Sequence, residues 1–174
     1  GTQAFYNCDL IKSVLLPETV KTIGYKAFSS CSKLQSINIP EGVTRIEEEA
    51  VSFCSKLKSV NFPNSITYIG KQAFCMAYEL ATVTLPDNLN CIGDRAFDEC
   101  DKLTSINIPE SLTTLEGNPF SGCYLVKFSG KYASADGKYL IKDGEVRSFC
   151  PGTNEDIEYT IPNEVTTIGN RAFC

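Results

Sequence analysis

The sequence is most informative first in what it lacks. Its 174 residues contain no histidine, no tryptophan and a single methionine. Without histidine, neither a Ser-His-Asp nor a Cys-His arrangement can form, and no glycine-rich phosphate loop is present. Carboxylate pairs such as Asp98 and Glu99 occur, but nothing in the sequence indicates a cleft around them. We therefore expect a protein that is not an enzyme and has no catalytic residues.

Metal and cofactor sites are also not expected. The nine cysteines include no C-x-x-C pair, and zinc sites in proteins are built mainly from cysteine and histidine. The net charge is -5 and the lysines are scattered, which argues against binding to nucleic acid. No apolar run reaches the length of a membrane span and no signal peptide is recognisable, so we expect no direct membrane insertion of this segment.

What the sequence does contain is a repeat of 23 residues. Apolar residues recur at this step at Ile23, Ile46, Ile69, Ile92 and Leu115, and prolines recur at Pro17, Pro40, Pro63, Pro86 and Pro109. A short, fixed period held by apolar residues is typical of a solenoid, in which each repeat forms one coil and stacks on its neighbours. Both ends of the sequence fall inside a repeat, so we expect residues 1–174 to be a single solenoid fragment of a longer protein.

Five cysteines follow the same period: Cys8, Cys31, Cys54, Cys100 and Cys123, with Ala77 at the remaining position. An odd total of cysteines and a tolerated alanine favour buried free thiols over a disulfide ladder. The other four, Cys75, Cys91, Cys150 and Cys174, lie off this ladder and are predicted to be the more exposed or reactive thiols.

Each repeat predicts one strand and one compact turn. In Leu34–Ile39 the apolar residues alternate toward the end, which predicts a strand with Ile37 and Ile39 facing inward. Equivalent segments are Ile11–Leu16, Leu57–Phe62, Leu80–Leu85 and Leu103–Ile108. Because successive coils run in the same direction, these strands should form one parallel sheet. The Ala-Phe pairs that follow, such as Ala27-Phe28, predict a short α or 3₁₀ turn on the outer face, with the phenylalanine buried.

The period breaks after Pro109, because Tyr132 stands where the next proline is expected and the next in-register proline is Pro162. The intervening segment contains Asp136-Gly137 and Asp143-Gly144, each beside short runs of strand-forming residues. Asp-Gly is a strong hairpin signal. We therefore predict an inserted three-stranded β-meander at residues 129–158, after which the repeat resumes.

The recurring I-P strand end, V-T-x-I-G, A-F and C-x-x-L resemble the BspA-like class of leucine-rich repeats over almost the whole chain. The resemblance implies an α/β fold, a right-handed leucine-rich-repeat solenoid with the parallel sheet, outer turns and meander described above. Members of the class are typically bacterial surface or secreted proteins, and several are linked to adhesion. The resemblance therefore implies an extracellular or cell-surface location and a host or matrix protein, or a glycan, as partner.

Candidate ligand-binding residues lie on the outward positions of the strands and in the inserted meander. They are Gln35, Asn38, Lys58, Asn61, Thr84, Thr104, Asn107, Tyr132, Tyr139 and Arg147. Two alternatives weaken this assignment: the Ser, Thr and Asn rows bond one another across the strands, or the meander aromatics only cover the end of the core. At the level of function, the alternative to an adhesin-like binding module is a spacer without a ligand. Self-association through uncapped coil ends is a further expectation.

Overall fold

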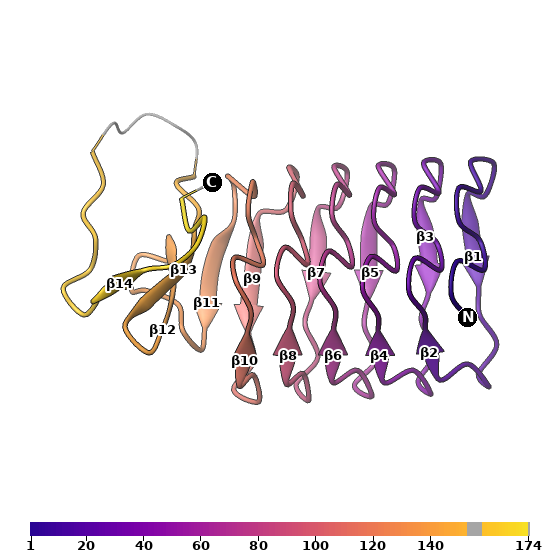
Figure 1. Ribbon diagram of the computed structural model, residues 1–174, viewed down its shortest axis with the longest axis horizontal. Coiled ribbons are helices and arrows are strands. Elements are labelled where there is room, and N and C mark those ends of the chain that lie inside the picture. The colour runs from indigo at the N-terminus through magenta and orange to yellow at the C-terminus, as the bar shows by residue number, and fades with distance from the viewer. Residues whose placement is uncertain (153–157, 174) are drawn as a thin grey trace.

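The computed structural model describes residues 1–152 and 158–173 and shows a solenoid whose repeats stack side by side along the long axis (Figure 1). The N-terminus lies at one end, and an inserted hairpin and the last repeat lie at the other. Each repeat consists of a three- or four-residue strand, a turn at the proline, a two-residue strand and a compact return segment. The predicted solenoid and its 23-residue stacking are confirmed.

The longer strands form what we call the strand face. They are β1 (Ser13–Leu15), β3 (Ser36–Asn38), β5 (Ser59–Asn61), β7 (Thr82–Thr84), β9 (Ser105–Ile108) and β11 (Lys127–Gly130). Their pairing is parallel and shifted by one repeat, as in Val14 opposite Ile37. The inward residues are buried and the outward ones exposed, because side chains alternate along a strand. The strands predicted from the sequence are therefore confirmed, although each is shorter than predicted.

The expectation of a single parallel sheet was wrong. The strand face is hydrogen-bonded as three separate pairs, β1 with β3, β5 with β7, and β9 with β11. The continuous five-stranded parallel sheet lies on a second face, which was not predicted. Its members are β2 (Thr22–Ile23), β4 (Arg45–Ile46), β6 (Tyr68–Ile69), β8 (Cys91–Ile92) and β10 (Thr114–Leu115). Two residues are too few to show an alternating pattern in a sequence.

The third side of each coil, which we call the turn side, comprises residues 1–10, 24–33, 47–56, 70–79, 93–102 and 116–125. The predicted α or 3₁₀ turns are absent there, and the described part of the chain has no helix at all, hence none able to cross a membrane. Two residues in most of these segments have a left-handed backbone: Gln3, Asn7, Lys26, Ser30, Glu49, Phe53, Gln72, Met76, Arg95 and Glu99. A helix cannot continue through such residues.

The left-handed residues direct alternate N–H groups out of the repeat. Ala27 N–H donates to the Gly24 carbonyl at 3.1 Å within its own repeat, whereas Phe28 N–H donates to the Ala50 carbonyl of the next repeat at 2.8 Å. A helix would direct the donors beyond its first turn to carbonyls four residues back in the same repeat, where they could not bond the next repeat. Each left-handed residue on the turn side costs roughly 1–2 kcal/mol relative to helical geometry. In return, the backbone forms hydrogen bonds between repeats.

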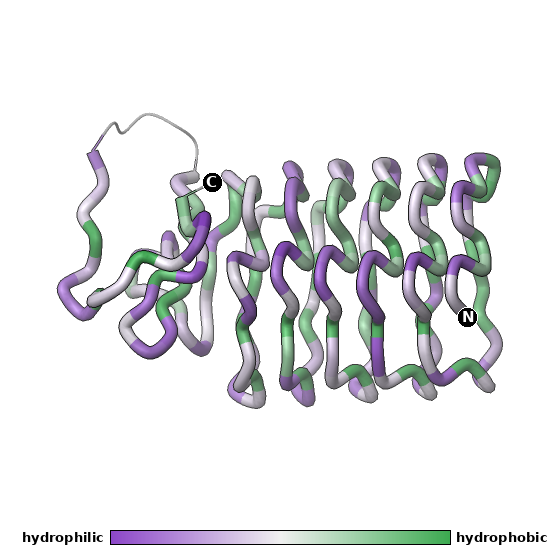
Figure 2. Tube along the Cα trace, viewed as in Figure 1, coloured by the Kyte–Doolittle hydropathy of each residue, from purple (hydrophilic) through white to green (hydrophobic). Residues whose placement is uncertain are grey.

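The interior is filled by side chains that stack on their equivalents in neighbouring repeats. Hydrophobic residues recur at the same places in successive coils (Figure 2). Phe74, Phe97 and Phe120 are fully buried, with ring centroids 5.4 Å apart and nearly parallel planes. Phe5 stacks on Phe28 in the same way at 5.1 Å. Val51 interrupts the series, so the phenylalanines form two separate stacks. The predicted burial of this position is confirmed except at the chain ends, where Phe5 and Phe173 are exposed.

The inserted segment begins at β11 and contains a hairpin of β12 (Tyr139–Lys142) and β13 (Glu145–Phe149). Asp143 and Gly144 join the two strands with φ of 55° and 75°, the double positive φ of a type I′ turn, as the Asp-Gly signal predicts. At the other Asp-Gly pair, the Asp136 carboxylate instead accepts from Ser134 Oγ at 2.6 Å and from Lys138 N at 3.0 Å.

Among the described residues of the insertion, a single antiparallel bridge from Ala133 to Leu140 stands in place of a third meander strand. On its other side, β13 pairs in parallel with β14 (Thr167–Ile168), which belongs to the resumed repeat. The hairpin therefore takes the place of a coil between β10 and β14. The predicted insertion, 129–158, also includes residues 153–157, which lie outside the described residues.

Candidate binding surfaces

The strand face presents seven of the predicted ligand-binding residues to solvent. These are Gln35, Asn38, Lys58, Asn61, Thr84, Thr104 and Asn107. Each strand carries its exposed side chains in register with those of the next, as the pairing of Asn61 with Thr84 shows. In the rows formed by these residues and the neighbouring serines and threonines, the side-chain hydrogen bonds found among the described residues are those of Ser129 Oγ, which donates to Asn107 Oδ1 at 3.1 Å and to the Ile106 carbonyl at 3.5 Å. Among the described residues, most polar side chains of the strand face therefore have no hydrogen-bond partner.

The three candidate residues of the inserted segment are less accessible. Tyr139 is only 1% exposed, and its hydroxyl donates to the Thr160 carbonyl at 3.2 Å, so its prediction as a surface residue was wrong. Tyr132 is half-buried and donates to the Leu112 carbonyl at 3.1 Å. Arg147 is half-buried and pairs with Glu145 at 2.8 Å. The hairpin aromatics thus pack against the structure, because the hairpin has to cover the end of the core.

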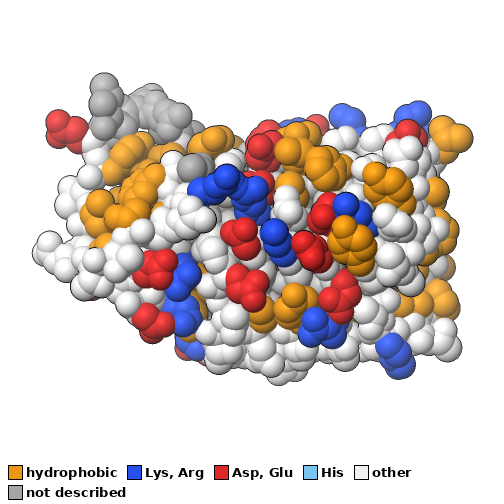
Figure 3. Space-filling model, in the orientation of Figure 1, with side chains coloured by type: hydrophobic (Ala, Val, Ile, Leu, Met, Phe, Trp, Pro, Cys, Tyr) orange, Lys and Arg blue, Asp and Glu red, His pale blue; other side chains and the backbone are white. Residues whose placement is uncertain are grey.

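Charges of both signs are interspersed on the face seen in Figure 3, where the hydrophobic side chains form separate small patches. Several of the charges pair between repeats. Lys26 lies 3.3 Å from Glu49, and Glu79 lies 2.5 Å from Lys102 and 3.9 Å from Lys56. Such exposed pairs contribute little to stability, because water and salt screen their charges. They neutralise the surface more than they stabilise the fold.

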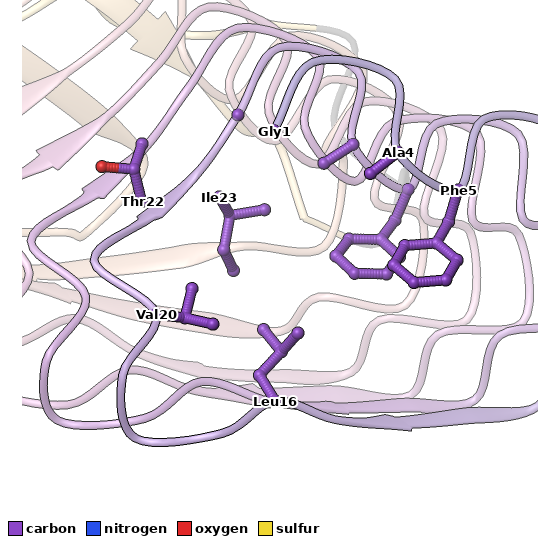
Figure 4. Close-up of a pocket in the computed structure, with 10 residues that line it drawn as sticks. Gly1, Ala4, Phe5, Leu16, Val20, Thr22 and Ile23 are labelled. Atoms are coloured by element: carbon purple, nitrogen blue, oxygen red, sulfur yellow. The ribbon is translucent and has the colours of Figure 1, made fainter.

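The N-terminal end of the solenoid opens into an apolar pocket of about 180 Å³ (Figure 4). Leu16, Val20 and Ile23 form one wall, and Ala4 and the stacked rings of Phe5 and Phe28 form the other. Apart from the half-buried Phe62, the equivalents of these residues in the inner repeats are buried. At this end of the solenoid, side chains at core positions are therefore accessible to solvent.

A second pocket, of about 370 Å³, lies on the turn side where the segments 93–102 and 116–125 meet. It is lined by Asp98, Glu99, Asp101, Ser121, Gly122 and Tyr124. The expectation that no cleft surrounds Asp98 and Glu99 was therefore wrong. Sequence reasoning missed the pocket because it treated these carboxylates as a pair in the chain. Alignment of the repeats would have placed Asp98 in a row with the buried Ser29, Ser52 and Ser121.

The ladder cysteines beyond Cys8 are buried thiols that bind the preceding repeat. Each donates its S–H to the carbonyl of the phenylalanine 26 residues earlier, with S···O distances of 3.1 Å for Cys31, 3.2 Å for Cys54, 3.4 Å for Cys100 and 2.9 Å for Cys123. At the rung without a cysteine, Ala77, the equivalent residue is Val51 instead of phenylalanine. The predicted role of the ladder at coil contacts is confirmed.

The prediction for the cysteines off the ladder was wrong for Cys75 and Cys150, which are both buried. Cys91 is half-buried, and Cys174 lies outside the described residues. Burial raises the pKa of the Cys54 thiol to about 12 and, together with the nearby Asp98 carboxylate, raises the pKa of Cys75 to about 12. A high pKa lowers the fraction of reactive thiolate near neutral pH.

We expect native alkylation at pH 8 to modify the half-buried Cys8 at least a hundredfold faster than the buried Cys54. Each residue can be followed by mass spectrometry of its own tryptic peptide after a timed pulse of iodoacetamide. Labelling in urea supplies the control, since all thiols should then react at similar rates. Equal native rates for Cys8 and Cys54 would contradict the burial described above.

The fold and its surfaces define an all-strand repeat solenoid with extended, solvent-exposed faces. A family model, the BspA type leucine rich repeat region, matches residues 1–127 in six copies. The chain therefore belongs to the BspA type leucine-rich repeat family. No curated protein matches the chain significantly.

Solved structures of bacterial proteins share the fold. A leucine rich cell surface protein from Faecalibacterium prausnitzii is 35% identical, with a TM-score of 0.82, over 95% of this chain and 46% of that one. A leucine rich repeat protein of T. pallidum is 36% identical, with a TM-score of 0.72, over 74% of this chain and 60% of that one. The pneumococcal vaccine antigen PcpA is 27% identical, with a TM-score of 0.81, over 93% of this chain and 42% of that one. The chain thus spans about half the length of these proteins.

Proposed function

We propose that this chain is a non-enzymatic binding module of a cell-surface or secreted protein, and that it binds a host or matrix protein, or a glycan, through the strand face. Similarity to a bacterial protein described as a leucine rich cell surface protein supports the location. The absence of histidine from the sequence supports a role without acid-base or nucleophilic chemistry of the Ser-His or Cys-His type.

The observation that carries the proposal is the uncommitted rows of polar side chains. Asn38 and Asn61 are exposed at the same position of successive repeats, and neither side chain has a hydrogen-bond partner among the described residues. Parallel strands lie about 4.8 Å apart, so donors and acceptors recur at that spacing along the solenoid. An amide side chain both donates and accepts. Such a surface suits an extended ligand that has a regular series of hydroxyl or amide groups.

Replacement of Asn38, Asn61 and Asn107 together by alanine is expected to weaken binding at least tenfold, because three amides are lost from one row. Surface plasmon resonance of the purified chain against a panel of matrix proteins, and a glycan array, would first identify a saturable ligand. The matched control replaces Asn64, Asn90 and Asn163, which are exposed but lie off the strand face. Unchanged binding by the strand-face variant would contradict the proposal.

The alternative function is a spacer that holds other parts of the protein at a distance. It is favoured by the composition of the strand face, where the seven exposed candidates include no aromatic residue and no arginine. Binding hot spots are enriched in tryptophan, tyrosine and arginine. Absence of saturable binding throughout the panel, together with a function that depends on the number of repeats, would support the spacer.

A further inference from the structure

The pocket beside Asp98 interrupts a regular row on the turn side. The equivalent residues in successive repeats are Ser29, Ser52, Cys75, Asp98 and Ser121, and all are buried. Small side chains occupy this row and contact their neighbours, as the 2.9 Å distance between Ser52 Oγ and Ser29 Oγ shows. Asp98 is the one charged member of the row.

The Asp98 carboxylate lacks a compensating charge. The side chain is nine-tenths buried, and its contact in the structure is the Cys75 thiol, which donates to Oδ2 at 3.7 Å. Within residues 1–152 and 158–173, Asp98 makes no ion pair, and Oδ1 has no hydrogen-bond donor. Among the described residues, Asp98 Oδ1 is not one of the buried polar atoms that lack a partner, so this oxygen is open to the pocket. No lysine or arginine lines the pocket that Asp98 faces.

The remaining walls of the pocket suit a positively charged ligand. Glu99 and Asp101 add two carboxylates, and Tyr124 adds an aromatic side chain that is 54% exposed. Tyr78 stands beside Glu99, with its hydroxyl 3.5 Å from Oε2. Carboxylates attract a cation, and an aromatic ring face adds a cation–π interaction. The combination is that of an organic cation site.

Gly122 is one of the lining residues of the pocket and has no side chain to fill it. The same position carries Ser30, Phe53, Met76 and Glu99 in the earlier repeats. A Cβ at residue 122 would lie only 3.0 Å from Glu99 Cγ. Among the described residues, no group of three or more acidic, cysteine or histidine side chains is arranged to hold a metal ion. The open volume and the spread of the carboxylates thus favour a larger cation.

We propose that the pocket formed by Asp98, Glu99, Asp101 and Tyr124 binds a primary ammonium or guanidinium group, with Asp98 as its counter-charge. The site lies on the turn side and is separate from the strand face, so it adds a second recognition surface to the repeat region. Its ligand is either a lysine or arginine side chain of a partner protein or a free amine, since both present the same cationic group.

Titration of the ¹⁵N-labelled chain with butylammonium and with the peptide acetyl-Gly-Lys-Gly-amide tests the proposal by NMR. We expect saturable shifts of the backbone amides of Asp98, Glu99, Ser121, Gly122 and Tyr124, and no such shifts with the norleucine peptide. Tighter binding of the lysine peptide than of butylammonium would identify a protein side chain as the source. Equal affinities would identify a free amine.

The Asp98→Asn variant keeps the shape of the side chain and is expected to weaken binding at least tenfold. The control Asp87→Asn removes one exposed carboxylate at a proline turn and should change affinity less than twofold. Tyr124→Ala, at a surface position that does not endanger folding, should weaken binding several-fold, whereas Tyr124→Phe should not. Absence of shifts at 20 mM of either probe, or full affinity in Asp98→Asn, would overturn the proposal.

Discussion

Replacement of Phe97 by alanine is expected to lower the free energy of unfolding by about 3–5 kcal/mol. Phe97 is fully buried between the parallel rings of Phe74 and Phe120, each at 5.4 Å. Removal of the ring leaves a cavity in the middle of the stack, and the regular backbone contacts on either side prevent the neighbouring rings from closing it. Urea unfolding followed by circular dichroism would measure the loss as a lower midpoint.

The matched control for this prediction is Phe53→Ala, because Phe53 is 41% exposed on the turn side. Its loss should cost less than about 1.5 kcal/mol, since a side chain that stays half in water contributes only part of its transfer free energy. Similar midpoints for the two variants would show that the ring stack does not stabilise the solenoid.

The second large effect is expected at Asn118, which fastens the C-terminal segment to the solenoid. Its side chain is buried, its Nδ2 donates to the Arg171 carbonyl at 2.7 Å, and its Oδ1 accepts from Ser148 Oγ at 2.5 Å. Asn118→Ala leaves these groups without partners. A buried polar group without a partner costs about 1–3 kcal/mol, so we expect a total loss of about 3 kcal/mol.

The loss at Asn118 should be local, because repeats contact mainly their neighbours. Hydrogen exchange should therefore speed up in β13 and β14 of the variant and remain unchanged in β3 and β5. Asn170→Ala is a suitable control, since Asn170 is exposed in the same repeat as Arg171. Uniformly faster exchange along the whole chain would contradict a local fastening role.

Those parts of the fold that depend on side-chain period were predictable from the sequence. Ile37 and Phe28 recur with their equivalents at a constant step, and burial follows directly from that recurrence. The Asp143-Gly144 turn was predictable because few other dipeptides adopt two positive φ angles without strain. The backbone of the turn side was not predictable. Lysine, glutamate and arginine there occupy left-handed conformations that they rarely adopt, and it is the hydrogen bonds to the next repeat that hold them.

The candidate sites were less predictable than the fold. The exposure of Asn38 and Asn61 followed from strand alternation, but the burial of Tyr139 depends on how the hairpin closes over the core. The pocket at Asp98 is lined by residues of two repeats, with Ser121, Gly122 and Tyr124 coming from the repeat further along the chain. Such a pocket arises where two stacked repeats differ. The 23-residue pattern records only what the repeats share, so it does not reveal the pocket.

The alternate N–H groups of the turn side, which cross from one repeat to the next, also determine how the molecule resists mechanical load. These bonds point along the long axis, as do the bonds between paired strands. A force that pulls the two ends apart in that direction therefore breaks the hydrogen bonds between one pair of repeats at a time. The repeats then separate one after another. Each released repeat contributes 23 residues, or roughly 75 Å of slack, which would let a tether lengthen stepwise under tension while the remaining repeats stay folded.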